Sequence, residues 1–332
     1  MGMSIHESAR EPAPAPGPAP EPAPAPGPAG EPAPALRIAV MQRASVPRDV
    51  DANLAALDAA AAEAKADGAG LIITPEMFIT GYSIGDDIGR LAADQPLERV
   101  GEISARHGIA IVAGGPELLN TSGRSKHGEA NELSDASEHS EASGSAKPAV
   151  ANSAWLFDDT GVVLARHRKI QLFGDLDRAH FVAGDAPVTI ATYRGLRIAM
   201  LVCFDVEYPE AVRHAALAGA DLIAVPTAQM EPFEFVNEHL IRVRAWENTV
   251  YVAYANQIGP DGDFTYVGRS VIVSPHGEHL AQAGPSENAL LTAVVDPAIL
   301  AAARAQNPYL VEVRRELFAS RPEPTARRPL RP

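Results

Sequence analysis

The chain has 332 residues, and its 28 Lys and Arg against 42 Asp and Glu give a net charge of −14. This acidic balance argues against nucleic acid and anionic membranes as partners. The only cysteine, Cys203, excludes an internal disulfide and any metal site built from several cysteines. A lone cysteine is usually an inert, small hydrophobic residue. A role for Cys203 therefore has to come from the residues around it.

Composition divides the chain into one domain and three segments that we expect to lack a fold. Residues 1–35 contain a ten-residue repeat, EPAPAPGPAP, whose alternating prolines predict an extended, disordered arm. Residues 121–148 are Ser, Glu, Ala and Gly with few apolar side chains, which predicts a low-complexity insertion. The domain is expected over 36–320, and a flexible tail over 321–332. Neither a signal peptide nor a membrane span is indicated, so we expect a cytoplasmic protein.

Within the domain, short apolar runs alternate with stretches of helical character. The first expected helix begins near Asp51 or Asn53 as N-cap. Strands are expected over 36–42, 71–74, 109–115, 152–158, 162–169, 188–202 (two strands), 221–227, 249–256, 268–275 and 289–296, and helices over 51–65, 97–107, 209–217 and 234–247. This alternation predicts an α/β fold.

Three reactive side chains each follow an apolar strand. Glu76 lies just past LIIT, Lys169 ends the run VVLARHRK, and Cys203 joins a strand to a helix. Each alone is an ordinary surface or core residue, but together they match the needs of amide hydrolysis. That reaction requires a nucleophile, a group that carries its proton to the leaving amine, and a cation or donor for the oxyanion.

The motifs around these residues resemble the nitrilase (carbon–nitrogen hydrolase) superfamily. They are PEMFITGY, RKIQLFGDLDR and CFDVEYPE, followed by PTAQMEPFEF, RVRAWEN and VAYAN. The resemblance implies an αββα sandwich of two face-packed mixed sheets with outer helices, usually assembled as a homodimer or larger homo-oligomer. It implies that Glu76 is the general base and acid, Lys169 the oxyanion stabiliser and Cys203 the nucleophile. The backbone N–H of Phe204 would be a second oxyanion donor, and neither a cofactor nor a metal is implied.

Many members of the superfamily also carry a second glutamate seven or eight residues after the lysine. Here position 176 is Leu and position 177 is Asp. The resemblance therefore implies that Asp177 takes this supporting role with a shorter side chain.

Within the superfamily, the stretches EMFITGYSIG, LFGDLD and PTAQMEPFEF most resemble 5-aminopentanamidases and related amidases of short aliphatic amides. This implies a small linear amide and water as the substrates, with 5-aminopentanamide as the best candidate. An ammonium at the far end of that substrate would need a carboxylate. The acidic candidates in these stretches are Asp86, Asp87, Glu231 and Glu234.

Other interpretations stay open or are weaker. The same triad would serve a general aliphatic amidase, an N-carbamoyl amidohydrolase, a nitrilase or an acyltransferase, and an inactive member could act as a binding module. No histidine lies in a motif that would pair with Cys203 as in papain-like proteases. His276 and His279, in HGEH, lack a third ligand and a turn is expected there instead of a metal site.

Overall fold

The computed structural model describes residues 34–119 and 149–318. Apart from Pro34 and Ala35, the predicted arm, insertion and tail lie outside these ranges. In the described part of the chain, no helix is both long enough and apolar enough to cross a membrane.

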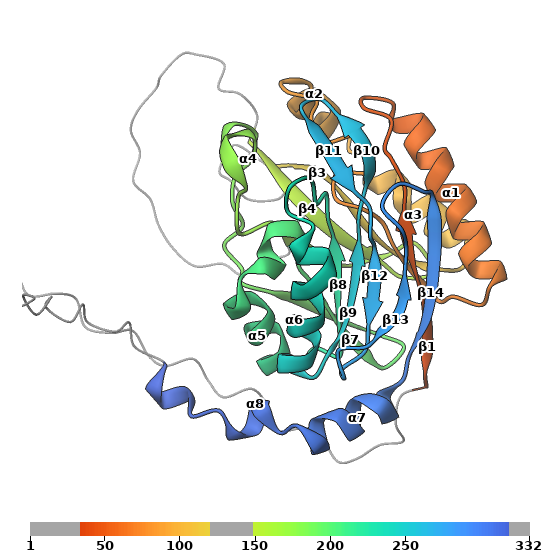
Figure 1. Ribbon diagram of the computed structural model, residues 1–332. Helices are drawn as coiled ribbons and strands as arrows, with labels where there is room; N and C mark the ends of the chain where they lie inside the picture. Colours follow the sequence, from red (N-terminus) through yellow and green to blue (C-terminus); the bar gives the residue numbers. More distant parts are fainter. Residues whose placement is uncertain (1–33, 120–148, 319–332) are drawn as a thin grey trace, which may run out of the picture. The chain divides into compact units, whose positions relative to one another are not determined.

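The first sheet has six strands in the order β14-β1-β2-β3-β4-β5 (Figure 1). Its strands are β1 (Leu36–Gln42), β2 (Leu71–Ile73), β3 (Ala110–Leu118), β4 (Val150–Phe157), β5 (Val163–Arg168) and β14 (Ala289–Val295). The central strands β1, β2 and β3 are parallel, and the outer pairings are antiparallel. Because β1 to β3 are parallel, their carboxyl ends meet at one edge of the sheet.

The second sheet also has six strands, in the order β13-β12-β9-β8-β7-β6. They are β6 (Thr189–Tyr193), β7 (Leu196–Met200), β8 (Leu222–Pro226), β9 (Tyr251–Ala255), β12 (Val271–Val273) and β13 (His279–Gln282). Strands β7, β8 and β9 are parallel. This sheet therefore repeats the plan of the first, with a parallel centre and antiparallel edges.

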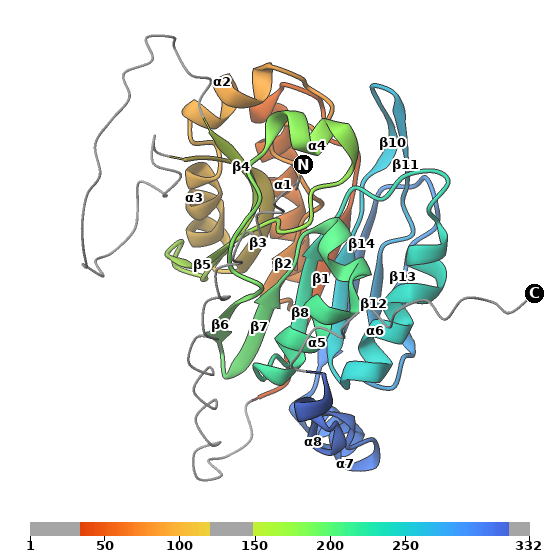
Figure 2. The ribbon, with the colours of Figure 1, turned by 90° about the vertical axis from the view of Figure 1, so that its left-hand side faces the viewer.

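Alternating side chains of the strands build three apolar layers. Along β1, Ile38 and Val40 pack into a core shared with β7, β8 and β9 of the other sheet, whereas Ala39 and Met41 face helices. The helices on that outer face are α1 (Val50–Ala66) and α3 (Glu98–His107), and those on the second sheet are α5 (Pro209–Leu217) and α6 (Ile241–Asn248). The two ribbon views show this order of layers (Figures 1 and 2). The predicted αββα sandwich is confirmed.

Several elements differ from the sequence-based prediction. The N-cap of α1 is Asp49, whose side chain accepts the Ala52 N–H, so the expectation of Asp51 or Asn53 was wrong. The helix expected over 234–247 begins with a π-helical turn, Val236–Leu240, before α6. Elements that were not predicted include α2 (Asp87–Ala93), α4 (Gly174–His180), strand β13, the hairpin of β10 (Ile258–Asp261) and β11 (Phe264–Val267), α7 (Pro297–Gln306) and α8 (Tyr309–Glu312).

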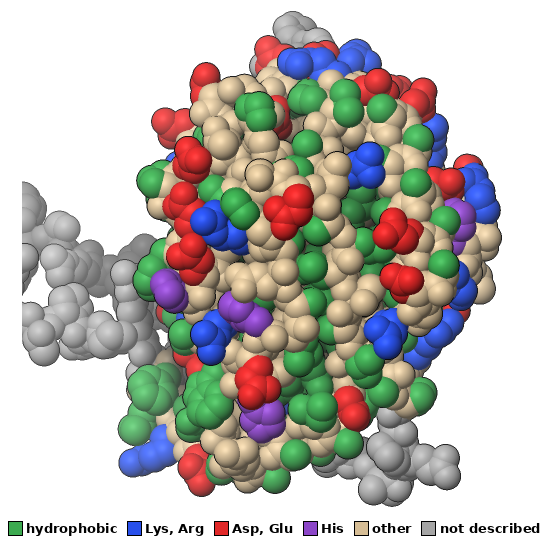
Figure 3. Space-filling view, turned by 45° about the vertical axis from the view of Figure 1, so that its right-hand side comes forward, with side chains coloured by type: hydrophobic (Ala, Val, Ile, Leu, Met, Phe, Trp, Pro, Cys, Tyr) green, Lys and Arg blue, Asp and Glu red, His purple; other side chains and the backbone are tan. Residues whose placement is uncertain are grey.

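Two features of the surface are of interest: the turn at HGEH and the distribution of charged side chains. His276 lies in the turn that joins β12 to β13, as the sequence predicted for HGEH. On the face shown in Figure 3, acidic, basic and hydrophobic side chains are interspersed.

Candidate active site

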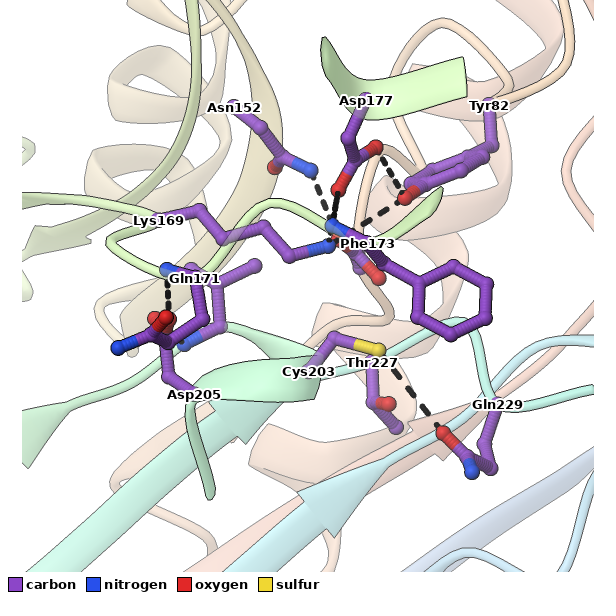
Figure 4. Close-up of polar contacts among 12 residues, drawn as sticks. Tyr82, Asn152, Lys169, Gln171, Phe173, Asp177, Cys203, Asp205, Thr227 and Gln229 are labelled. Atoms are coloured by element: carbon purple, nitrogen blue, oxygen red, sulfur yellow. Dashed lines mark hydrogen bonds and ion pairs between the residues drawn. The ribbon is translucent and has the colours of Figure 1, made fainter. Parts of the chain in front are cut away.

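The ends of β2, β5 and β7 bring Glu76, Lys169 and Cys203 together. Figure 4 shows Lys169 and Cys203 with the polar side chains around them. The backbone of Glu76 is fixed from the opposite sheet, since its N–H donates to the Thr227 carbonyl just past β8 at 3.1 Å. The Glu76 carbonyl accepts the Gln257 side-chain amide at 2.9 Å. These two bonds hold the carboxylate of Glu76 at a defined place in the core.

Lys169 is the centre of a buried ionic cluster. Its Nζ donates to Glu76 Oε1 at 2.8 Å, to Asp177 Oδ2 at 2.8 Å and to the Tyr82 hydroxyl at 3.3 Å. Burial would lower the pKa of Lys169, but the opposing influence of Glu76, Tyr82, Cys203 and Asp177 is stronger and raises it well above its ordinary value. Lys169 is therefore a fixed cation.

Asp177 is fully buried in the first turn of α4, where the sequence placed a supporting carboxylate. Its Oδ2 accepts the Phe173 backbone N–H at 2.8 Å as well as the Lys169 ammonium, and its Oδ1 accepts the Tyr82 hydroxyl at 2.6 Å. Both oxygens of Asp177 are thus satisfied, and the Lys169 ammonium donates to Asp177 as well as to Glu76.

The Glu76 carboxylate has one engaged and one free oxygen. Oε1 accepts from Lys169 and from the Asn152 amide at 2.7 Å, while Oε2 is buried without a hydrogen-bond partner among the described residues. Burial raises the pKa of Glu76, and the charge of Asp177 adds to this, against the lowering effect of Lys169. The neighbouring Cys203 thiol also lowers the pKa of Glu76. A carboxylate with these properties can accept a thiol proton and later release it.

Cys203 lies at a strained corner between β7 and a short 3-10 helix, η1 (Cys203–Glu207). Its backbone φ of 46° is in the left-handed region that residues other than glycine rarely adopt. Such backbone strain is common where a reactive group is held in place. Burial raises the pKa of the Cys203 thiol well above its usual value, and the charge of Glu76 adds to this. Cys203 at rest is therefore a thiol that needs a base.

One carboxylate fastens the Lys169 segment to the Cys203 corner. Asp205 is fully buried, and it accepts backbone N–H groups of Ile170 at 3.1 Å and Gln171 at 2.8 Å, directly after Lys169. It also accepts the N–H of Val202, directly before Cys203, at 3.0 Å. Buried His167 adds an Nε2 at 3.4 Å from Asp205 Oδ2.

The sequence named Glu76, Lys169, Cys203 and Asp177, and the structure brings all four together. The sequence analysis did not identify Tyr82, Asn152 or Asp205 as members of the site. Tyr82 and Asp205 lie inside the motifs PEMFITGY and CFDVEYPE, which could have pointed to them, whereas Asn152 lies in an ordinary strand and carries no sequence signal.

Phe204 follows Cys203 in η1, and its ring packs edge-to-face on Phe173, with 5.3 Å between ring centroids.

The four acidic candidates for substrate binding lie at or near the surface. Asp87 pairs with Arg48 at 2.6 Å and with Arg90 at 3.3 Å near the surface, and Glu231 is exposed. Glu234 is partly buried, and Asp86 is exposed at the start of α2.

Comparison with known proteins agrees with this geometry. The model of the carbon–nitrogen hydrolase family matches residues 37–305. The chain belongs to the carbon–nitrogen hydrolase family. It is therefore a hydrolase of the nitrilase superfamily that acts on amide bonds, as the sequence predicted.

Relatives within the family are hydrolases and amidases. A "Hydrolase in pqqF 5'region" from Pseudomonas protegens is 38% identical over 85% of this chain and 90% of its own length. An (R)-stereoselective amidase from Pseudomonas sp. is 34% identical over 54% of this chain and 65% of its own length.

A solved family structure is similar over most of the fold. One such structure is a mutant amidase from Nesterenkonia sp. AN1, with the acetamide moiety of fluoroacetamide added to its active-site cysteine. It matches with a TM-score of 0.70 and 33% sequence identity, and the match covers 86% of this chain and 95% of the amidase chain. Another mutant of that amidase, in complex with butyramide, has a TM-score of 0.69 and 34% identity, covering 86% and 96%.

The Asp177 carboxylate should matter more than its neighbour Asp175. We expect Asp177→Asn to lower kcat/KM by about 10- to 100-fold, because it removes one charge of a buried ion pair with Lys169. Asp175 is exposed and pairs only with Arg178 at 3.6 Å, so Asp175→Asn should change kcat/KM by no more than about twofold. Ammonia release from a short amide measures both, and equal, mild effects would contradict a supporting role for Asp177.

Asp205→Asn should lower kcat by about 10- to 100-fold, because an amide cannot accept all the N–H groups that hold Lys169 beside Cys203. The matched control is Asp158→Asn, which alters a carboxylate that accepts the N–H groups of Thr160 and Val162 in a surface turn. Melting temperature is measured in parallel. A lower melting temperature with unchanged kcat would show that Asp205 stabilises the fold without positioning the site.

Proposed function

We propose that this chain hydrolyses small linear carboxamides through a thioester on Cys203 and releases ammonia. The observation that carries the proposal is the buried carboxylate of Glu76, which contacts the Lys169 ammonium at 2.8 Å and interacts with the Cys203 thiol. One nucleophile, one proton carrier and one fixed cation thus share a single buried site.

In the acylation half of this mechanism, Glu76 takes the thiol proton as the sulfur of Cys203 attacks the amide carbon. The carbonyl oxygen gains negative charge, which the Lys169 ammonium stabilises together with the Phe204 backbone N–H. Glu76 then gives its proton to the amide nitrogen. The carbon–nitrogen bond breaks, ammonia leaves, and the acyl group remains on sulfur.

Deacylation uses the same groups in reverse order. Water attacks the thioester carbon while Glu76 takes a proton from it. The carbon–sulfur bond then breaks, the acid leaves, and the proton on Glu76 returns to the Cys203 sulfur. Each half-reaction therefore leaves Glu76 ready for the next, so that no further base is required.

The comparisons support this chemistry. The amidase from Nesterenkonia sp. AN1 has an active-site cysteine that carries an added acetamide moiety, and butyramide binds to a mutant of it. Since this chain aligns with 95% or more of that enzyme, a cysteine thioester and a short acyl chain are reasonable for it as well. A general aliphatic amidase is accordingly the second candidate function.

We infer 5-aminopentanamide as the preferred substrate, from the sequence motifs that resemble 5-aminopentanamidases. Partly exposed aromatic rings next to the nucleophile are compatible with an acyl chain of several methylenes. Phe173 packs against Phe204 with 5.3 Å between ring centroids and against Phe233 with 5.9 Å. Methylene groups packed on such rings gain about 0.8 kcal/mol each.

Cys203→Ala should abolish ammonia release without lowering the melting temperature by much, since the change removes little volume. Glu76→Gln should lower kcat by more than the ~10²–10⁴ of a single proton-transfer group, because the cluster acts as a unit. Mass spectrometry of rapidly quenched enzyme should detect an acyl adduct on the wild type and none on Cys203→Ala. Turnover in Cys203→Ala close to that of the wild type would refute the mechanism.

Wild-type enzyme should hydrolyse 5-aminopentanamide with a kcat/KM about 10- to 100-fold above that for pentanamide, the value of a charge-assisted contact of about 1.5–3 kcal/mol. The two substrates have nearly the same length, so that the ammonium is the variable. Equal kcat/KM values would contradict the subfamily assignment and favour a general aliphatic amidase.

A further inference from the structure

The amide side chain of Gln229 lies directly beside the nucleophile. Its Oε1 is 4.0 Å from the Cys203 sulfur and 3.5 Å from the Tyr254 hydroxyl, and its Nε2 donates to the Phe233 carbonyl at 3.1 Å (Figure 4). Gln229 is only 4% exposed, and its backbone N–H is held by Asn256 at 2.7 Å. The position of this amide relative to the sulfur is therefore fixed.

Glu207 ends η1, four residues after Cys203. Since a 3-10 helix rises about 2.0 Å per residue, the backbones of Glu207 and Cys203 are roughly 8 Å apart along its axis. Burial raises the pKa of the Glu207 carboxyl group, and the neighbouring Gln229 side chain lowers it. Glu207 is partly buried, so it is both close to the site and open to a small ligand.

Glu207 has no ion pair with any residue that the structure describes. The nearby Arg244 is fully engaged elsewhere: it donates to the Val206 carbonyl at 3.0 Å, to the Glu207 carbonyl at 2.6 Å and to the Glu247 carboxylate at 2.9 Å. Lys169 is committed to Glu76 and Asp177. A partly buried carboxylate without a cationic partner in the protein can be stabilised by a cationic group of a ligand.

Aromatic residues adjoin both the nucleophile and this carboxylate, since Phe204 follows Cys203 and Tyr208 follows Glu207. Phe204 follows Cys203 directly and packs edge-to-face on Phe173 and on Tyr208, with ring centroids 5.3 Å and 5.1 Å away. Phe233, whose carbonyl holds Gln229, packs on Phe173 as well. The site therefore offers a nucleophile, an aromatic wall and a carboxylate within reach of one another.

We propose that Glu207, beside Gln229, binds a cationic group at the far end of the acyl chain and thereby selects short ω-amino amides. This inference rests on the proposed function. The dimensions agree: four methylenes in an extended chain place an ammonium roughly 6 Å from the carbonyl carbon, and that carbon lies ~3–3.5 Å from the attacking sulfur. The four acidic residues that the sequence suggested are then not needed for recognition of the ammonium.

Three amides of similar length test the proposal: 5-aminopentanamide with a cationic end, uncharged pentanamide, and 4-carbamoylbutanoate with an anionic end. Wild type should favour 5-aminopentanamide over pentanamide by about 10- to 100-fold in kcat/KM. Glu207→Gln should reduce this ratio to between about one and three, through loss with the cationic substrate. Glu207→Arg should reverse the preference and favour 4-carbamoylbutanoate.

Two matched variants serve as controls. Glu210→Gln neutralises an exposed glutamate at the start of α5, three residues further along, and Glu231→Gln neutralises an exposed candidate from the sequence. Both should keep the wild-type ratio. A preference that survives Glu207→Gln, or that is lost in Glu231→Gln instead, would overturn the assignment to Glu207 and leave amide hydrolysis standing. Absence of ammonia from all three amides with wild-type enzyme would instead refute the proposed function itself.

Discussion

The contact on which the site depends is the Lys169 ammonium held between the carboxylates of Glu76 and Asp177, with 2.8 Å to each. All three side chains are fully buried, and a buried ion costs several kcal/mol unless partners replace its lost hydration. One cation between two carboxylates leaves a net negative charge when both are ionised. A proton arriving at Glu76 would make the cluster neutral, which is the change that acid–base catalysis needs.

The rest of the fold supplies the partners that make this cluster tolerable. The Asn152 amide donates to the Glu76 oxygen that contacts Lys169, and the Phe173 backbone N–H donates to the Asp177 oxygen that does so. The Tyr82 hydroxyl donates to the other oxygen of Asp177. The oxygen left over, Oε2 of Glu76, has no hydrogen-bond partner among the described residues. It is therefore available to accept the thiol proton, as the proposed mechanism requires.

Much of this arrangement could be predicted from the sequence because the catalytic candidates lie at the ends of strands. Apolar runs with clear limits located β1, β2, β7 and α5, and each catalytic candidate followed such a run. Asp177 required the resemblance as well, since nothing in its local pattern predicts burial. The hairpin β10–β11 and helix α4 were missed because their sequences lack a regular apolar period.

Residues that act through tertiary contacts could not be predicted from the sequence. The Asn152 amide donates to Glu76, which lies 76 positions earlier in the chain. Gln229 contacts Cys203 only because β8 lies beside β7. The acidic residues proposed for an ammonium were chosen by motif alone, and Asp87 proved to be paired with two arginines. Glu207 was inside a quoted motif, but only its partly buried place at the end of η1, beside the nucleophile, distinguishes it from an ordinary surface charge.

The central claim is that Cys203 is a protonated thiol at rest and that Glu76 is the base that activates it. The ultraviolet absorbance of the thiolate, titrated with pH and corrected by Cys203→Ala, measures this directly, because the chain has a single cysteine. The account predicts that the thiolate signal appears only above the ordinary thiol pKa, while amide hydrolysis already proceeds at neutral pH. A thiolate that forms well below that pKa would contradict it, since the nucleophile would then need no base.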